Sequence, residues 1–205
     1  LLGAEQSGFI ADIGYETYQK ILKEAVLELK TEEFADTFAD EHQDSANAEY
    51  ANDCTIESDL EILFPASYVP QESERILLYQ ELDNMERQED VDAFCKRLED
   101  RFGAIPDQAR ELILVVTLRR LARRLGIEKI VLKQRHMTMF FVSSENAAYY
   151  QSPAFGRILT YLQQNVRIAN LNEHNNRRSM RIDGIKTVRE ATDVVRHILD
   201  LPVCD

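Results

Sequence analysis

Residues 106–142 read PDQARELILVVTLRRLARRLGIEKIVLKQRHMTMFFV, and a change of hydrophobic period within this stretch decides the fold class. Apolar residues first recur every three or four positions, which predicts an α-helix that begins near Pro106 and ends at a left-handed Gly126 cap. From 127 to 142, apolar and polar residues alternate on either side of a turn at Gln134-Arg135-His136. This alternation predicts a β-hairpin, so the stretch joins a helix to antiparallel strands.

The residues before this stretch are mostly helical in pattern. Apolar side chains recur with helical spacing over 71–86 and again over 89–101, and Gly103 breaks the second segment. Further upstream, Leu60, Ile62 and Phe64 alternate with Asp59, Glu61 and Leu63 until Pro65 interrupts them. This alternation predicts a short strand before the helices.

The residues after the hairpin contain two further helix patterns. Ser152-Pro153 is an N-cap followed by a first-turn proline and predicts a helix to Gln164, and 187–199 has a second apolar stripe. Between them we expect a short strand over 166–171, a polar loop over 172–178 and a strand at 179–182. The sequence therefore predicts an α+β fold with a helical segment packed on a small, mostly antiparallel sheet.

The first 58 residues have a different composition from the rest of the chain. Glycines at 3, 8 and 14 indicate a loop, and a helical stripe of apolar residues follows over 15–30. Residues 31–58 are rich in Asp, Glu, Ala, Asn and Ser and keep no hydrophobic period, which is typical of an acidic linker. We therefore expect three parts, 1–30, 31–58 and 59–205.

The charge of the chain is unevenly distributed. The net charge of the 205 residues is −12, but 31–100 carry −17 and 101–205 carry +7. The overall acidity argues against a generic nucleic-acid or membrane-surface binder. No stretch approaches the roughly 20 apolar residues of a membrane helix, and the three dispersed cysteines fit reduced thiols. These features predict a cytoplasmic protein without a membrane partner.

Motifs of catalytic or cofactor sites are absent from the sequence. It has no phosphate-binding loop, no G-x-S-x-G elbow and no H-E-x-x-H pair, and its seven glycines are scattered. The four histidines lie far apart along the chain. We therefore expect no catalytic residue, no cofactor and no metal site in this chain.

Four arginines form the most concentrated charge of one sign. Arg119, Arg120, Arg123 and Arg124 share one face of the predicted helix, opposite its apolar stripe. This basic patch could be a solvated face, a docking surface for acidic side chains or a contact for nucleic-acid phosphates. No aromatic residues alternate with the arginines, which disfavours the nucleic-acid reading. Four aromatic residues elsewhere fit core packing better than base stacking: Phe140, Phe141, Tyr149 and Tyr150.

Several ordered motifs resemble one bacterial family. LGAEQSG at 2–8 and IGYETY at 13–18 resemble the segment after the motor in RecG and in the transcription-repair coupling factors. The coupling factors are the better match, because RecG shares only the first thirty residues. The motifs of the later part, which resemble the start of the coupling factors' C-terminal domain, are DLEI at 59–62, YVP at 68–70, Arg75, Tyr79, DRFG at 100–103 and LGI at 125–127.

The resemblance implies a non-catalytic part of a DNA translocase. Gln6, Ser7 and Gly8 match the end of a motif that couples ATP hydrolysis to movement on duplex DNA. ATP and Mg would belong to the parent motor, whose nucleotide site is not in this sequence. Residues 59–205 would be the regulatory domain, which packs on the parent's own UvrB-like N-terminal domain and masks the surface that recruits UvrA. Engagement of a stalled RNA polymerase would release this contact.

One position departs from the family pattern. Family members usually have an acidic residue just before the leucine that precedes Asp-Arg-Phe-Gly, where it can pair with arginines of the masked domain. Arg97 occupies that position here. Either the pairing has changed polarity, or Glu99 or another acid replaces it. The candidate interdomain contacts are therefore Arg97, Glu99, Asp100 and Arg101. The alternative function is a nucleic-acid-binding module that uses the basic patch.

Overall fold

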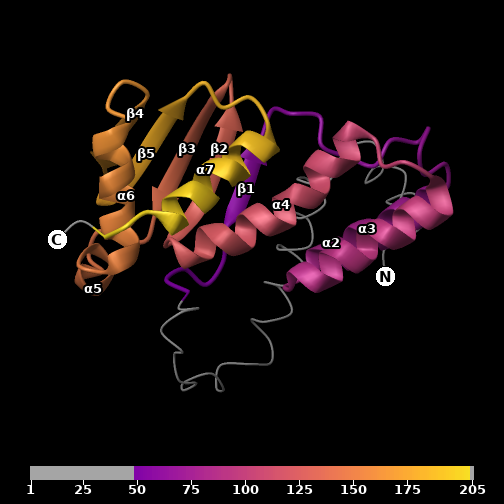
Figure 1. The fold of residues 1–205 in the computed structure, drawn as a ribbon, viewed down its shortest axis with the longest axis horizontal. Helices are drawn as coiled ribbons and strands as arrows, with labels where there is room; N and C mark the ends of the chain where they lie inside the picture. The colour runs from indigo at the N-terminus through magenta and orange to yellow at the C-terminus, as the bar shows by residue number, and fades with distance from the viewer. Residues whose placement is uncertain (1–48, 204–205) are drawn as a thin grey trace, which may run out of the picture. The chain divides into compact units, whose positions relative to one another are not determined.

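The computed structural model describes residues 49–203, in which six helices and a five-stranded sheet confirm the α+β fold class (Figure 1). Contacts divide the described residues into a helical unit, Ile62–Leu112, and a sheet unit formed by 49–61 and 113–203. Helix α4 (Asp107–Arg124) begins in the first unit and ends in the second. The helix predicted over 15–30 and most of the predicted linker lie outside the described residues.

The helical unit contains α2 (Glu72–Asp83) and α3 (Gln88–Phe102), close to their predicted positions. Tyr79 of α2 and Phe94 of α3 are buried, and their rings lie 5.2 and 6.3 Å from the ring of Phe64. Gly103, with φ of 84°, ends α3 as expected. An aromatic cluster therefore holds the two helices to the loop that precedes them.

Motif residues of the helical unit fix this loop through hydrogen bonds. The buried Arg75 guanidinium donates to the carbonyls of Val69 and Pro70, at 2.7 and 3.1 Å. The Tyr79 hydroxyl accepts a bond of 3.0 Å from the amide of Phe64. Burial raises the pKa of Tyr79, so its hydroxyl stays neutral at physiological pH. Arg75 and Tyr79 therefore stabilise the fold.

The sheet has the strand order β1-β2-β3-β5-β4. Strand β1 pairs in parallel with β2, and the other three pairings are antiparallel. The sheet is therefore mostly antiparallel, as predicted. Its strands are β1 (Thr55–Ser58), β2 (Ile127–Lys133), β3 (His136–Phe141), β4 (Ala169–His174) and β5 (Arg177–Asp183).

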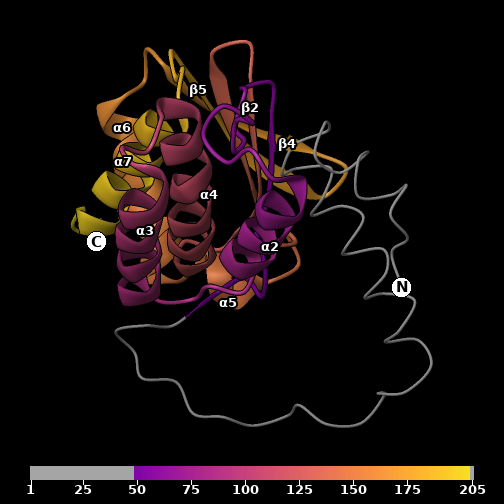
Figure 2. The same ribbon diagram turned by 90° about the vertical axis from the view of Figure 1, so that its right-hand side faces the viewer.

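Helices of the sheet unit cover one side of this sheet. Helices α6 (Pro153–Gln164) and α7 (Val188–Asp200) contact each other and lie on the same side (Figure 2). Their N-caps are Ser152, as predicted, and Thr187, whose side chains accept bonds from Phe155 and Glu190 amides. The centre of the covered side is apolar and at most 2% exposed, and contains Ile130, Leu132, Met137, Met139, Met180 and Ile182.

The junction between α4 and β2 is built around Gly126. Its φ of 70° confirms the predicted left-handed cap, and a Cβ at this position would overlap the ring of Tyr149. The Tyr149 hydroxyl donates a 2.5 Å bond to the carbonyl of Leu125. Burial raises the pKa of Tyr149, and it packs near Phe141 and Phe155. Phe141 and Tyr149 are thus core residues.

The first strand lies earlier than predicted. We expected it over 59–64, but β1 spans Thr55–Ser58, within the range assigned to the acidic linker. Ile56 is buried and pairs with Ile130, while the amides of Tyr50 and Ala51 donate to the carbonyl of Arg123. Pairing with β2 selects this acidic segment as a strand, which its composition does not indicate.

A hairpin replaces the loop predicted over 172–178. Strands β4 and β5 pair from Ala169↔Ile182 to His174↔Arg177, and Asn175 and Asn176 form the turn with φ of 50° and 59°. Asparagine tolerates this left-handed conformation, so a two-residue turn forms without glycine. Because β4 is an edge strand and mostly exposed, its residues are polar, which hides the strand from a hydrophobic-pattern analysis.

The short helix α5 (Ala147–Tyr150) was not predicted, because four residues are too few for a period. No helix within residues 49–203 has the length and apolar character needed to cross a membrane.

Candidate functional site

The candidate interdomain contacts lie together on the last turns of α3. Arg97 pairs with Glu81 of α2, and Arg101 pairs with Glu74 of the same helix. Their guanidinium groups lie 5.8 and 5.1 Å from the ring centroids of neighbouring phenylalanines. The arginine side chains are nevertheless 62% and 65% exposed. Both arginines are therefore bound within the helical unit, in pairs that water screens.

Glu99 and Asp100 have a different environment on the same helix. Both are exposed, and neither forms an ion pair with a base of the described residues. Relative to the buried Leu98, helical geometry directs Asp100 away from the core and Glu99 to the flank opposite Arg97. The end of α3 thus offers two carboxylates to a partner, while its two arginines are already paired.

The basic patch on α4 is less exposed than a solvated face. All four arginines are half-buried. The Nε of Arg119 donates a 3.2 Å bond to the carbonyl of Cys54, and its Nη2 lies 3.4 Å from Asp53. Arg123 Nη2 lies 3.3 Å from Glu49. Arg120 also has an interaction partner. Arg119 and Arg123 therefore anchor the chain segment that leads into β1.

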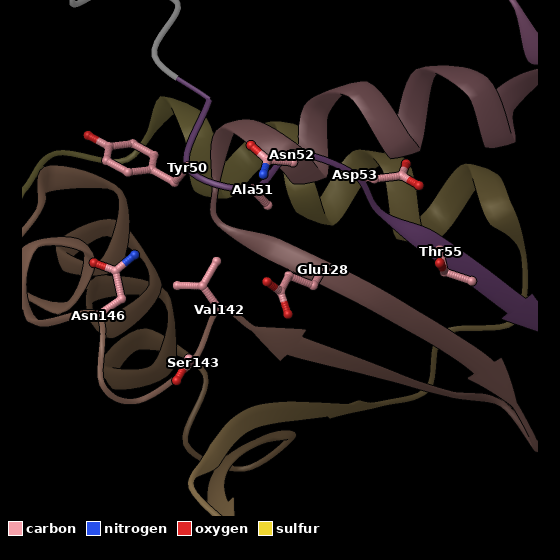
Figure 3. A pocket seen from close by; sticks show the side chains of 9 residues that line it. All are labelled: Tyr50, Ala51, Asn52, Asp53, Thr55, Glu128, Val142, Ser143 and Asn146. Carbon is pink, nitrogen blue, oxygen red and sulfur yellow. The ribbon is translucent and has the colours of Figure 1, made fainter. Parts of the chain in front are cut away.

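A pocket of about 440 Å³ lies beside this anchored segment in the sheet unit (Figure 3). Asp53 and Glu128 supply its carboxylates, but each has an arginine partner, Arg119 at 3.4 Å and Arg177 at 3.6 Å. The lining contains no histidine, lysine or cysteine that could serve as a base or nucleophile. Its residues are Tyr50, Ala51, Asn52, Asp53, Thr55, Glu128, Val142, Ser143 and Asn146.

Chemistry elsewhere in the described residues is limited. No three His, Cys, Asp or Glu side chains within 49–203 are placed to hold a metal ion. Cys54 is buried, and burial is the main cause that raises the pKa of Cys95, which disfavours its thiolate. His136 Nδ1 lies 2.8 Å from Asp183 on the sheet. The arrangement suits a binding surface better than a catalytic centre.

Two sets of residues remain: the predicted translocation motif and the acidic partners of the basic patch. Gln6, Ser7 and Gly8 lie outside the described residues, so their assignment to a translocation motif stays a prediction. The partners of the basic patch, Glu49 and Asp53, were not identified from the sequence. They precede Arg119 and Arg123 by more than sixty positions, and acidic residues are too frequent there for local spacing to reveal the pairing.

Comparisons with known proteins agree on one family. The family model described as "TRCF domain" matches residues 58–152. The transcription-repair-coupling factors of Escherichia coli and Mycobacterium tuberculosis are 30% and 33% identical over 130 residues, 63% of this chain. That of Helicobacter pylori is 27% identical over 154 residues, 75% of this chain. These alignments cover only 10–14% of the relatives, so the chain spans a small fraction of their length.

The fold is similar to a solved structure as well. A crystal structure of the C-terminal domain of a transcription-repair coupling factor superposes with a TM-score of 0.58 and 15% identity. The match covers 72% of this chain and 91% of that one. At this identity the similarity establishes the fold alone.

Proposed function

We propose that this chain, whose residues 58–152 match the TRCF domain model, is the regulatory C-terminal part of a transcription-repair-coupling factor. The parent protein would be an ATP-dependent DNA translocase of the cytoplasm that couples transcription to nucleotide excision repair. ATP and Mg would bind to its motor, and RNA polymerase, duplex DNA and UvrA would be partners of the whole protein. The chain itself would act by contact, without catalysis.

We place the contact on the end of α3, within the matched residues. The partner would be the UvrB-like N-terminal domain of the same protein, and the contact would mask the surface that recruits UvrA. The single observation that carries this placement is the unpaired, exposed state of Glu99 and Asp100 beside two paired arginines. These carboxylates can receive arginines of the masked domain, whereas Arg97 is occupied by Glu81.

The energetics suit a reversible contact. Exposed ion pairs contribute roughly 0–1 kcal/mol each, and salt screens them. A contact built from a few such pairs would be weak enough for a competing partner to displace it. Engagement of RNA polymerase would then change which surface is accessible, by shifting an existing equilibrium.

A binding titration with a charge-reversed variant tests this proposal. The chain 1–205 would be titrated by calorimetry with the isolated UvrB-like domain. We expect binding that weakens with salt, and at least tenfold weaker binding for the double variant Glu99→Lys/Asp100→Lys. The matched control is Asp193→Lys/Asp200→Lys, which makes the same charge change at exposed positions of α7.

The results separate two kinds of failure. If the wild-type chain does not bind the UvrB-like domain at all, the proposed function is wrong. If it binds and the α3 variant binds equally well, the masking role stands without the α3 contact, and the interface lies elsewhere on the chain.

The alternative function, nucleic-acid binding by the basic patch, has less support. Arg119 and Arg123 are engaged by Asp53, Glu49 and the backbone of Cys54. Recruiting them to phosphates would break the bonds that hold the entry to β1. A duplex-DNA titration of the chain at low and moderate salt, with Arg120→Ala/Arg124→Ala as the variant, would detect such binding.

A further inference from the structure

Within residues 49–203, no helix covers the second side of the sheet, which presents a distinctive set of side chains (Figure 2). The pairing register places Lys129, Phe140, Ser179 and Asn172 in one row across four strands. The adjacent row contains Val131, Thr138, Arg181 and Asn170. None of these eight residues is buried, whereas the other side of the sheet is the apolar core. We call these two rows, with Lys133 and Arg177 from the flanking rows, the open face.

An aromatic ring with two cations lies at the middle of the open face. Phe140 is on β3, the central strand, and its side chain is half-buried. Lys129 Nζ lies 5.9 Å from the ring centroid, and the Arg177 guanidinium carbon lies 5.1 Å from it. Flat rings and flat guanidinium groups are the surfaces on which unpaired nucleobases stack.

The charge of the open face is the opposite of the charge of the chain. Lys129, Lys133, Arg177 and Arg181 contribute four positive charges, whereas Glu57 and Asp183 contribute the carboxylates on this side of the sheet. Glu57 is shared between two lysines, at 2.8 Å from Lys129 and 3.5 Å from Lys133. A third carboxylate, Glu128 at the irregular start of β2, lies 3.6 Å from Arg177. Arg181 Nε lies 3.2 Å from Asp183, so each cation has a carboxylate neighbour, and the four cations exceed the three carboxylates by one in a chain of net charge −12.

Amides and hydroxyls complete the face. Asn170 and Asn172 are exposed on the edge strand β4, where Asn170 pairs with Arg181 and Asn172 with Ser179, and Thr138 lies on the other side of Arg181. Asparagine amides both donate and accept, so they can pair with the polar edge of a base. Four strands at about 4.8 Å spacing give a platform about 14 Å wide, enough for two or three nucleotides.

We propose that the open face binds single-stranded nucleic acid, with bases stacked at Phe140 and Arg177 and phosphates held by Lys129, Lys133 and Arg181. A duplex would hide its base faces from the ring, so an unpaired strand is the expected ligand. An acidic peptide would use the cations but leave the aromatic ring and the amides without a role. Strands β4 and β5 lie beyond residue 152, where the family match ends, so the proposal does not rest on the proposed function.

Fluorescence anisotropy of labelled ten-nucleotide oligothymidine and oligouridine with the full chain tests the proposal. A ten-residue oligoglutamate peptide is the third probe. We expect both oligonucleotides to bind at 50 mM salt, and the tighter of them to identify DNA or RNA as the source. With about three phosphate contacts, binding should weaken roughly twentyfold between 50 and 200 mM salt.

Three variants locate the binding. Phe140→Leu keeps an apolar side chain but removes the ring, and should weaken binding about fivefold to tenfold. Arg177→Ala/Arg181→Ala removes one stacking group and one of the three phosphate contacts, so it should weaken binding and lower the salt slope by about 0.7. The matched control Arg189→Ala/Arg196→Ala removes two exposed arginines of α7 and should change affinity less than twofold. Thermal melting would confirm that each variant is folded.

Three results would overturn the proposal. The first is no oligonucleotide binding at 50 mM salt by the folded chain. The second is equal affinity of the wild type, Phe140→Leu and the Arg177/Arg181 variant. The third is oligoglutamate binding that is as tight as oligonucleotide binding and equally sensitive to these variants, which would assign the face to an acidic protein partner.

Discussion

The arginines of α3, in the helical unit, and those of α4, in the sheet unit, have opposite roles. In the helical unit, Arg97 and Arg101 reach carboxylates across the protein surface and stay more than 60% exposed. In the sheet unit, Arg119 and Arg123 are about 20% exposed and hold the chain that enters β1. A charge on a helix therefore indicates function only when its partners are known: the α4 patch is mainly structural, and the α3 carboxylates are available for binding.

The net charges of the two units reinforce this contrast. The described part of the helical unit has twelve acidic and six basic residues, and that of the sheet unit has twelve acidic and fifteen basic residues. The helical unit is thus suited to a cationic partner, and the sheet unit to an anionic one. The following changes test how the two units differ, from the largest expected effect to the smallest.

The largest contrast should come from two glycines with positive φ. Gly126→Ala in the sheet unit should reduce the free energy of unfolding by about 3 kcal/mol, because the new Cβ would overlap the buried Tyr149 ring. Gly103→Ala in the helical unit also has positive φ, but open space around it, and should cost about 1 kcal/mol. Urea unfolding of both variants measures the difference. Equal losses would mean that backbone strain alone determines the cost.

A pair of arginine substitutions separates structural from exposed charge. Arg119→Met keeps the apolar stem but leaves the Cys54 carbonyl and Asp53 without this donor, and should destabilise the chain by about 2 kcal/mol. Arg97→Met removes only an exposed pair and should change stability by at most about 0.5 kcal/mol. Thermal melting at two salt concentrations checks both values. A larger loss at Arg97 would refute the distinction between the two sets of arginines.

Alkaline pH probes the tyrosine at the α4–β2 junction. Burial raises the pKa of Tyr149 in the folded state, so folding favours its neutral form. Its contribution to stability is complete below the unfolded pKa of about 10 and declines as pH rises above that value. Tyr149→Phe removes the hydroxyl bond to Leu125 and should lower the free energy of unfolding by about 1 kcal/mol at pH 7. As pH rises above about 10, the free energy of unfolding of the variant should fall less than that of the wild type. Parallel pH profiles of the two proteins would show that Tyr149 does not contribute.

Substitutions in the two hairpin turns of the sheet should give a small gain in stability. Gln134 and Arg135 form the β2–β3 turn with φ of 52° and 63°, which non-glycine residues other than asparagine rarely adopt. Gln134→Asn/Arg135→Gly should stabilise the chain by about 0.5–1 kcal/mol. The same type of change at the β4–β5 turn, Asn176→Gly, should have a smaller effect because Asn175 and Asn176 already suit it. Equal gains at both turns would contradict this reading.

Local signals made the helices and the central hairpin predictable. Helices α3, α4, α6 and α7 have apolar stripes with proline, glycine or hydroxyl residues at their ends, and these signals act within a few positions. Gly126 was predictable for the same reason. The α+β class followed from the change of period at that glycine.

Long-range pairing decided what the sequence did not reveal. Strand β1 forms because Ile56 pairs with Ile130, and β4 forms against β5 although its residues are polar. The candidate site shows the same limit. The packing of α2 against α3 brings Arg97 to Glu81 and Arg101 to Glu74, and no local pattern specifies this packing.

Competition for the UvrB-like domain is the most direct test of the masking role. UvrA binding to the isolated domain would be measured with increasing amounts of chain 1–205, and again with its Glu99→Lys/Asp100→Lys variant. We expect that the wild-type chain displaces UvrA and that the variant does so only at a concentration at least tenfold higher. A stable ternary complex of chain, domain and UvrA would contradict it.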